Sequence, residues 1–316
     1  MLRSTGVSRT VPAVLALQGG LGNQLYQWAF GTALRAAGVP LAVDVTRCRG
    51  HRPLAIEPLI RDWPRVPRVV GLPLAALTRG RSTLRRPVRL VRDDALAGGE
   101  YDDALVAAIV SGGSHRPQPP GQARPGLAGP APWYLLGYFQ SPRYFQEVRA
   151  QVTEQATAFV RSQLTPEGEQ LYREWAGRED SVAIHVRRGD YLTDAAAAAT
   201  HGVMAPSYYQ GARELLDGQG LRRVAWFSDD PPWVEQTLAR DGDRLITGEG
   251  LCTADGGEIA LMSACRVRVL ANSSFSWWAG FLGRPSSPER PIIAPAAWYK
   301  DGRSTGDRIM PGWSTL

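Results

Sequence analysis

The sequence predicts an α/β protein made of two doubly wound domains that face a cleft, each built on a parallel sheet. Strands and helices alternate in both halves of the chain, which favours parallel sheets covered by helices. A glycine-rich turn joins the first strand to the first helix. Residues 181–187 form a buried strand that ends in arginines and a carboxylate, and ligands of open α/β sheets bind at such carboxyl ends.

Composition narrows the class of protein. The 316 residues carry a net charge of +6, and Lys300 is the only lysine among many arginines. The arginines are scattered without a long basic run, so nucleic acid is not the expected partner; an anionic substrate or an acidic membrane surface fits the charge as well. Three widely spaced cysteines form neither a disulfide framework nor a metal-binding CxxC pair, which predicts a reducing, cytoplasmic location.

The first strand–helix–strand unit spans residues 11–46. Residues 11–17 read as a buried strand, 18–23 as a glycine-rich loop and 41–45 as the second strand. Between them, apolar and small residues recur at helical spacing until Gly38 and Pro40 end the helix. The residues with this spacing are Leu25, Trp28, Ala29, Thr32, Ala33 and Ala36.

The glycine-rich loop fits neither common nucleotide motif. Gly20 and Gly22 are followed by Leu25 where a dinucleotide fingerprint needs a third glycine or alanine, and the P-loop pattern is absent. A ligand could approach such a backbone beside the positive end of a helix. The other interpretation is a tight turn in which Asn23 simply caps the helix. Asn23 and Gln24 at the helix start favour a polar ligand.

The next hundred residues are less informative. Residues 101–110 suggest a short helix, and residues 112–132, rich in glycine and proline, predict a flexible surface loop. Residues 133–139 form an aromatic-rich strand. A helix then begins at Ser141 or Pro142 and reaches about residue 164, and residues 165–180 read as a polar connector to the second half.

The stretch from Ser181 to Tyr191 is the most informative. Val182, Ile184 and Val186 alternate as in a strand, which would place His185 and Arg187 on one side and Arg188 on the other. Arginine offers a planar fork of donors suited to phosphate. The alternative is a surface turn with salt-bridged arginines.

Residues 206–216 predict a helix with Tyr208, Tyr209, Ala212 and Leu215 on its core face.

Two further acidic patterns follow this helix. The strand 223–227 ends at Asp229 and Asp230, which could bind a base or ribose, start the next helix as caps, or do both. Asp241 and Asp243 match an acidic D-x-D metal motif, but without a preceding apolar strand they predict a solvated turn.

The last third repeats the alternation. Residues 258–264 predict a helix, 267–270 a strand and 292–295 a final short strand. Between them, Ser273 is a good N-cap for a helix whose free amides could hold an anion, and Trp277 and Trp278 would anchor that helix on the sheet.

Several of these segments together resemble the α-1,2-fucosyltransferases, glycosyltransferase family 11. Residues 47–132 match the family poorly. The resembling segments, in chain order, are GGLGNQLYQWAFGTAL at 19–34, GYFQSPRYF at 137–145, HVRRGDYL at 185–192, FSDDPPWV at 227–234, LMSACRVRVLANSSFSWWAGFL at 261–282 and, more weakly, IIAPAAWY at 292–299.

The resemblance implies a GT-B-like fold of two Rossmann-like domains, with residues 1–150 on the acceptor side and 151–316 binding a GDP-sugar. It implies transfer of L-fucose from GDP-β-L-fucose to the 2-hydroxyl of a galactose or similar sugar, with inversion and without a metal or other cofactor. The acceptor would be a glycan or glycolipid, and the enzyme cytoplasmic, with peripheral contact at the inner face of the membrane as a possibility. The alternatives are a transferase for another GDP-sugar and a non-catalytic nucleotide- or sugar-binding protein.

Residue roles are hypotheses at this stage. Arg187 would contact the diphosphate and His185 would help to position the donor. Asp190 or His185 could be the general base, and the sequence does not choose between them. The remaining expected site residues are Gly20, Gly22 and Asn23 near the reacting centre, Asp229 or Asp230 on guanine or ribose, Asn272 fixing its loop, and Ser273, Ser274 and Phe275 around the phosphates.

Overall fold

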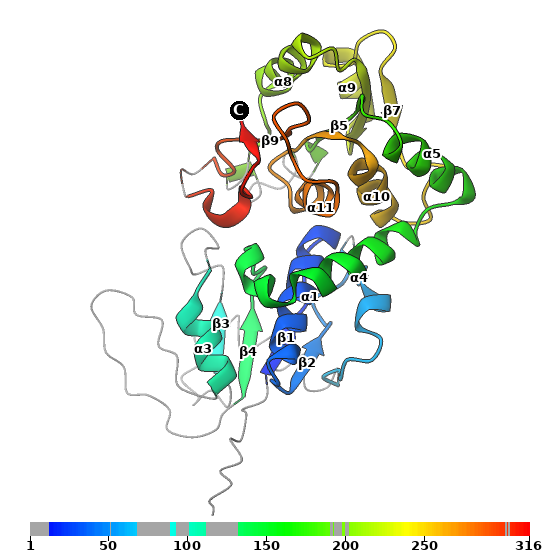
Figure 1. The fold of residues 1–316 in the computed structure, drawn as a ribbon. Coiled ribbons are helices and arrows are strands. Elements are labelled where there is room, and N and C mark those ends of the chain that lie inside the picture. The colour runs from blue at the N-terminus through cyan, green and yellow to red at the C-terminus, as the bar shows by residue number, and fades with distance from the viewer. Residues whose placement is uncertain are drawn as a thin grey trace, which may run out of the picture. The chain divides into compact units, whose positions relative to one another are not determined.

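The structure is a computed structural model that describes residues 13–50, 52–67, 89–92, 101–111, 132–189, 192, 198–199, 202–300, 302 and 304–316. The chain divides into two compact units, Met1–Val152 and Thr153–Leu316. Both are α/β units with parallel sheets, so the predicted GT-B-like fold class is confirmed (Figure 1). Asp190, the start of the first predicted strand and nearly all of the predicted loop 112–132 lie outside the described residues.

The first unit contains a four-stranded parallel sheet of order β2-β1-β4-β3. Its strands are β1 (Ala13–Ala16), β2 (Leu41–Asp44), β3 (Arg89–Arg92) and β4 (Trp133–Leu136). Its helices are α1 (Leu21–Ala36), α3 (Asp103–Ser111) and the 3₁₀ segments η1 (Glu57–Ile60) and η4 (Pro142–Val148), and α4 (Arg149–Arg161) runs on across the unit boundary.

Helix α1 begins without a side-chain cap. Gly20 is its N-cap residue and offers no side-chain hydrogen bond, so the alternative prediction that Asn23 caps the helix is wrong: Asn23 lies inside the first turn. Gln24 is fully buried, and its amide hydrogen-bonds the backbone of Gly19, Pro53 and Ala55. Gln24 therefore braces the glycine turn from within the unit.

The second unit contains a six-stranded sheet of order β10-β9-β8-β5-β6-β7, in which the paired strands are parallel. Its strands are β5 (Ser181–Val186), β6 (Arg223–Ser228), β7 (Arg244–Ile246), β8 (Val267–Val269), β9 (Ile292–Ala294) and β10 (Ser314–Thr315). Its helices are α5 (Pro166–Ala176), α8 (Pro206–Gly218), α9 (Pro231–Thr237), α10 (Gly256–Ala264), α11 (Ser274–Leu282) and the 3₁₀ segment η5 (Gly306–Arg308).

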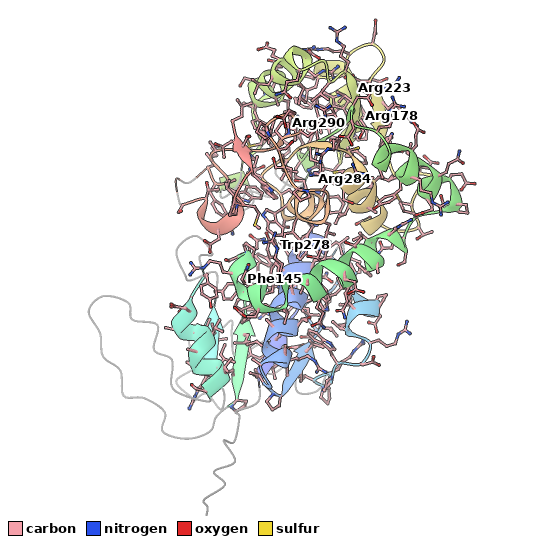
Figure 2. All side chains as sticks on the ribbon, in the orientation of Figure 1. Phe145, Arg178, Arg223, Trp278, Arg284 and Arg290 are labelled. Atoms are coloured by element: carbon pink, nitrogen blue, oxygen red, sulfur yellow. The ribbon has the colours of Figure 1, made fainter. Side chains whose placement is uncertain are left out.

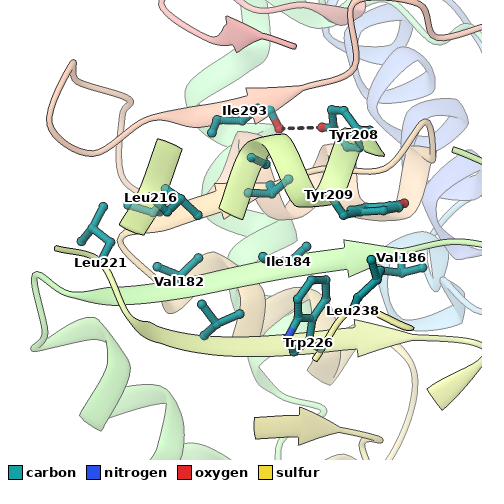
Figure 3. Packing of buried hydrophobic residues seen from close by; sticks show 14 of the residues in the cluster. Val182, Ile184, Val186, Tyr208, Tyr209, Leu216, Leu221, Trp226, Leu238 and Ile293 are labelled. Atoms are coloured by element: carbon teal, nitrogen blue, oxygen red, sulfur yellow. Dashed lines mark hydrogen bonds between the residues drawn. The ribbon is translucent and has the colours of Figure 1, made fainter. Parts of the chain in front are cut away.

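Strand alternation assigns the two faces of this sheet. Val182, Ile184 and Val186 of β5 pack in one apolar cluster with residues of α8 and α9 (Figure 3). The intervening side chains face the other layer, where α10 lies against both α5 and α11. On that side the ring of Phe227 meets Trp175 of α5, and the ring of His185 meets Phe275 of α11. The polar side chains that follow β5 and β6 therefore emerge between two covered faces.

The structure corrects the predicted polar connector at residues 165–180, which contains helix α5. The helix has local signals of its own, because Thr165 caps it by accepting a hydrogen bond from Gly168 N and Pro166 occupies its first position. Leu171 and Trp175, four residues apart, are buried. A polar majority on the exposed face hid this short apolar stripe.

Two smaller predictions are also wrong. Leu215 is 53% exposed, and its neighbour Leu216 fills the predicted core position instead. Asp243 lies at a turn, as expected, but its side chain is only 2% exposed and ion-pairs at 2.9 Å with buried Arg213. It also accepts a hydrogen bond of 2.8 Å from Trp226 Nε1, so Asp243 is a structural buried carboxylate.

Arginines that are scattered in sequence gather at the amino end of β5. Asp180 pairs with Arg178 and Arg223, and Glu179 pairs with Arg266, Arg284 and Arg290. Figure 2 labels four of these arginines in the second unit. The network is mostly exposed and lies at the end of β5 opposite to Arg187. Separately, no helix in the described part of the chain is both long and apolar enough to cross a bilayer.

Candidate functional site

The carboxyl end of β5 brings an arginine against an aspartate. β5 and β6 pair in register up to Val186 and Ser228, so the next residues, Arg187 and Asp229, come side by side. Arg187 Nη1 lies 3.0 Å from Asp229 Oδ2. The backbone N–H groups of Arg188 and Gly189 donate to the same carboxylate at 2.8 and 3.0 Å. Asp229 thus fixes the turn that carries the arginines, at the place where parallel sheets present ligands.

Gly189 is required by this close approach. A Cβ atom at position 189 would lie 2.8 Å from Asp229 Oδ2, closer than such contacts normally come. Arg188 points elsewhere, because its Nε donates to Asp230 Oδ2 at 3.0 Å and its guanidinium stacks 3.8 Å above the ring centroid of Trp233. Asp230 also caps α9 by accepting a hydrogen bond from Trp233 N, which confirms the helix-capping role that was one of its two predicted roles. The two arginines therefore diverge, with Arg188 fixed in the protein.

His185 is a buried, neutral imidazole. It is 5% exposed, and its ring centroid lies 5.6 Å from that of Phe275. Burial, and then the nearby charge of Arg187, lowers the pKa of His185 to about 3. Its Nδ1 is buried without a hydrogen-bond partner within the described part of the chain. Such a group can offer a hydrogen bond to a ligand, but it holds a proton poorly at neutral pH.

The turn before α11 lies next to this pair. β5 and β8 pair up to Ile184 and Val269, so three residues further along each strand come Arg187 and Asn272. Asn272 is 1% exposed, and its Nδ2 donates to the carbonyls of Gly202 and Trp298 at 3.1 and 3.4 Å. It locks the turn from which the helix starts.

Ser273 caps α11 as predicted. Its hydroxyl accepts a hydrogen bond from Phe275 N, and the hydroxyl of Ser276 donates to Ser273 O at 3.3 Å. The positive end of α11, at Ser274 and Phe275, is therefore held at the same edge of the sheet as Arg187. A guanidinium and a helix amino terminus together favour an anion there.

Glu258 is a residue of this edge that the sequence analysis did not single out. It lies in the first turn of α10, and burial, Asp255 and then Asp229 raise the pKa of its carboxyl to about 7. Gly248, at φ +77°, makes room for it, since a Cβ at position 248 would lie 2.6 Å from Glu258 Oε1. No sequence motif marks Glu258; only its surroundings distinguish it from an ordinary helix carboxylate.

The first unit holds the other predicted loop. Gly19 has φ +80°, and a Cβ there would lie 2.7 Å from Asn23 Nδ2, so glycine is needed on both counts. Gln140 Nε2 donates to Asn23 Oδ1 at 2.6 Å. Gly20 lies against Arg52, whose Nη1 would be 2.9 Å from a Cβ at position 20. Asn23 and Arg52 thus flank the glycine turn.

The backbone near this loop carries one strained residue. Phe139 is the one non-glycine residue with positive φ, +51°, in the described ranges, and it is fully buried against Phe30 and Tyr144. The next residue, Gln140, is the one whose side chain bonds Asn23. Gly22, by contrast, is buried inside α1.

The structure therefore groups the expected residues in two sets. Gly20, Gly22 and Asn23 lie in the first unit. No pattern in the sequence marks Gln140 and Arg52 in that unit, or Gly248 and Glu258 in the second unit. The second-unit set contains His185, Arg187, Asp229, Asp230, Asn272, Ser273, Ser274 and Phe275.

Comparison with known protein families identifies the family of this chain. The model of the family described as Glycosyl transferase family 11 matches residues 123–316, more than half of the chain. This chain belongs to that family. The resemblance stated from the sequence motifs is thereby confirmed. The match includes the arginine turn, the aspartate pair and the start of α11.

Among curated proteins, two from Escherichia coli are similar to this chain over part of their length. The O-antigen biosynthesis glycosyltransferase WbnK is 32% identical over 138 residues, which cover 43% of this chain and 45% of that protein. An alpha-1,2-colitosyltransferase is 29% identical over 172 residues, covering 52% and 56%. The galactoside 2-alpha-L-fucosyltransferase of Caenorhabditis elegans is 26% identical over 184 residues, covering 54% and 46%. The alignments thus span about half of each relative.

Solved structures give weaker likenesses. The crystal structure of NodZ alpha-1,6-fucosyltransferase soaked with GDP-fucose aligns at a TM-score of 0.44 and 13% identity, covering 86% of this chain and 92% of that one. A family 9 glycosyl transferase from Veillonella parvula aligns at 0.44 and 10% identity, covering 97% and 87%. Both are low in identity and in score.

Proposed function

We propose that this family 11 enzyme transfers L-fucose from GDP-β-L-fucose to the 2-hydroxyl of a galactose or similar residue, with inversion at the anomeric carbon. The observation that carries the proposal is the pairing of Arg187 with Asp229 at the edge of the sheet where α11 begins. A guanidinium and the free amides of a helix start are the groups that stabilise a diphosphate leaving group. The relatives named for alpha-1,2 transfer support the linkage.

The chemistry can be written on this chain's own groups. The bond between the anomeric carbon and the diphosphate oxygen breaks, and GDP leaves with the electron pair. The oxygen of the acceptor 2-hydroxyl bonds to the opposite face of that carbon and loses its proton to a base. Arg187 and the amides opening α11 stabilise the charge that grows on the diphosphate, so no metal or other cofactor is required.

His185 and Asp229 support this step in different ways. Because its pKa is low, His185 stays neutral and can form a hydrogen bond with the GDP-sugar. For the same reason it is a poor base for the proton of the acceptor sugar's 2-hydroxyl. Asp229 holds the guanidinium of Arg187 in place. We assign the general base to Asp190, because it directly follows the arginine turn in the sequence.

Acceptor recognition is assigned to the first unit. Asn23, oriented by Gln140, and Arg52 beside Gly20 place polar groups at the glycine turn. We propose that they bind a hydroxyl-rich glycan or glycolipid acceptor. The reaction would take place in the cytoplasm, with peripheral contact at the inner face of the membrane when the acceptor is lipid-linked.

A second candidate keeps the site and changes the donor. One relative is named for colitose transfer, so a GDP-sugar other than GDP-fucose would occupy the same diphosphate site. Turnover of GDP-fucose compared with GDP-mannose, measured as GDP release with a panel of galactosides, distinguishes the two. Release from GDP-mannose alone would reject fucose as the transferred sugar.

Titration with GDP tests the diphosphate site directly. Arg187→Ala should weaken GDP binding about tenfold to a hundredfold, because it removes a charge-assisted contact of about 1.5–3 kcal/mol. The matched control is Arg223→Ala, which removes a mostly exposed arginine at the amino end of β6. Excess chelator should leave the GDP affinity of both variants unchanged. Equal losses in both variants, or loss of binding on chelation, would contradict the proposed site.

A further inference from the structure

Glu258 is a half-buried carboxyl group that has no function in the proposal so far. Its carboxylate accepts no hydrogen bond and joins no ion pair anywhere in the described ranges, although the nearby acidic groups Asp255 and Asp229 act on it. Partly buried carboxylates are normally paired, because leaving water without a partner is costly. An unpaired carboxyl group at the edge of a ligand site therefore needs an explanation.

The sheet order places Glu258 at a defined position along that edge. The phosphate-binding turn follows β8, Arg187 follows β5, Asp229 follows β6, and Gly248 follows β7. Glu258 touches Gly248 and feels the charge of Asp229, so it lies on the β6–β7 side. Adjacent strands are about 4.8 Å apart, so β8 and β6 are separated by about 10 Å. A nucleotide whose diphosphate lies at the α11 turn would place its nucleoside near Glu258.

The two aspartates on this edge are already engaged. Asp229 accepts from Arg187 and from the N–H groups of Arg188 and Gly189. Asp230 accepts from Arg188 and from the N–H of Trp233. These bonds fix the arginine turn and cap α9, so turning either carboxylate toward a nucleoside would break local structure. Glu258 carries no such bond within the described ranges and is free to accept one.

Two neighbouring residues, Gly248 and His185, indicate a ligand site at Glu258. Gly248 has a backbone conformation that L side chains rarely adopt, and a Cβ there would lie 2.6 Å from Glu258 Oε1, so a side chain would displace the carboxyl group. On the β5 side, the Nδ1 of His185, a residue 95% buried, has no partner within the described part of the chain. An unmatched acceptor and an unmatched imidazole nitrogen thus accompany Arg187 along one edge.

We propose that Glu258 binds the nucleoside of the GDP-sugar by accepting hydrogen bonds from a pair of adjacent donors. The ribose 2′,3′-diol and the N1–H and N2–H₂ groups of guanine both offer such a pair. The proposal rests on the proposed function, because it takes the diphosphate to lie at Arg187 and α11. It makes Glu258 a positioning and specificity residue rather than one that contacts the reacting atoms.

Calorimetric titration of the full chain tests the proposal. Glu258→Gln keeps the side-chain size, replaces one acceptor oxygen by a donor, and should weaken GDP binding about tenfold to a hundredfold. Inorganic pyrophosphate, which lacks a nucleoside, should bind the variant and the parent equally. The matched control is Glu235→Gln, an exposed carboxylate on α9, which packs on the other face of the sheet. It should leave both affinities unchanged.

Analogues identify the donor pair. If Glu258 holds the ribose, 2′-deoxy-GDP binds the parent more weakly than GDP, and Glu258→Gln no longer distinguishes the two. If it holds guanine, inosine diphosphate, which lacks the N2 amine, takes the place of 2′-deoxy-GDP in this comparison. If Glu258→Gln prefers GDP over each analogue as strongly as the parent does, Glu258 does not touch the nucleoside.

The outcomes separate this proposal from the one on which it rests. Unchanged GDP affinity in Glu258→Gln, together with the expected loss in Arg187→Ala, overturns the role of Glu258 and leaves the transferase assignment standing. A parent protein that binds neither GDP nor pyrophosphate overturns both. Gly248→Ala is a second variant, which pushes the carboxyl group away without altering it. It should weaken GDP binding while leaving pyrophosphate binding unchanged, and equal GDP affinity in this folded variant would also count against the proposal.

Discussion

Replacing Glu258 by glutamine should stabilise the second unit at alkaline pH. The carboxyl group has a pKa of about 7 in the fold, against an ordinary value of 4.5, because burial and two neighbouring carboxylates disfavour its charge. Each pKa unit corresponds to about 1.36 kcal/mol, so ionised Glu258 costs the folded state up to about 3 kcal/mol. Partial exposure of the group reduces the effect to about 2 kcal/mol. Glutamine avoids this cost because it carries no charge.

The effect should depend on pH in one direction. Between pH 4.5 and 7 the folded chain holds a proton on Glu258 that the unfolded chain releases, so folding becomes less favourable as the pH rises through this window. Above pH 7 the full cost is present, and below pH 4.5 it disappears. Glu258→Gln should therefore exceed the parent in free energy of unfolding at pH 8 and match it near pH 4.5.

Urea denaturation followed by tryptophan fluorescence at both pH values measures this difference. The control is again Glu235→Gln, for which the difference should stay within about 0.5 kcal/mol at either pH. A Glu258→Gln variant that is no more stable than the parent at pH 8, or equally stabilised at both pH values, would refute the electrostatic reasoning. Agreement would mean that the site keeps a destabilising carboxyl group, as binding sites often do.

Two further predictions concern groups that the structure buries. Asp243→Ala should lower the free energy of unfolding by about 2–3 kcal/mol, because buried Arg213 loses its 2.9 Å partner and keeps a 3.3 Å pair with Asp217, while Trp226 Nε1 loses its acceptor. Exposed Asp241→Ala is the control and should change it by less than about 0.5 kcal/mol. If Asp243 instead held a catalytic metal, the variant would lose turnover that added Mg²⁺ or Mn²⁺ restores, with little loss of stability. Burial raises the pKa of Cys48 to about 11 and of Cys252 to about 12, and it raises the pKa of Cys265 as well. A thiol reagent at pH 8 should therefore react slowly with the native protein and rapidly with three thiols in urea, and a fast native thiol would contradict the burial.

Local chemistry in the sequence was sufficient for most elements of the second unit. Alternating apolar residues predicted the strand that is observed as β5, and its continuation placed His185 and Arg187 on one side. Capping chemistry located helix starts at Asp230 and Ser273, where a short polar side chain meets the free N–H groups of the first turn. The same information at Thr165 and Pro166 would have revealed α5, whose narrow apolar stripe was outweighed by its polar residues.

The order of the strands decided what the sequence could not. Asp229 meets Arg187 because β6 lies beside β5, and Asp243 is buried because its turn reaches Arg213 of α8 and Trp226 of β6. Glu258 differs from other helix carboxylates only through its neighbours in space. The sequence by itself determined which segments form strands, helices and caps, since these depend on residues a few positions apart. The tertiary structure determined which charges are paired, buried or left without a partner, because those free energies depend on contacts between residues far apart in the chain.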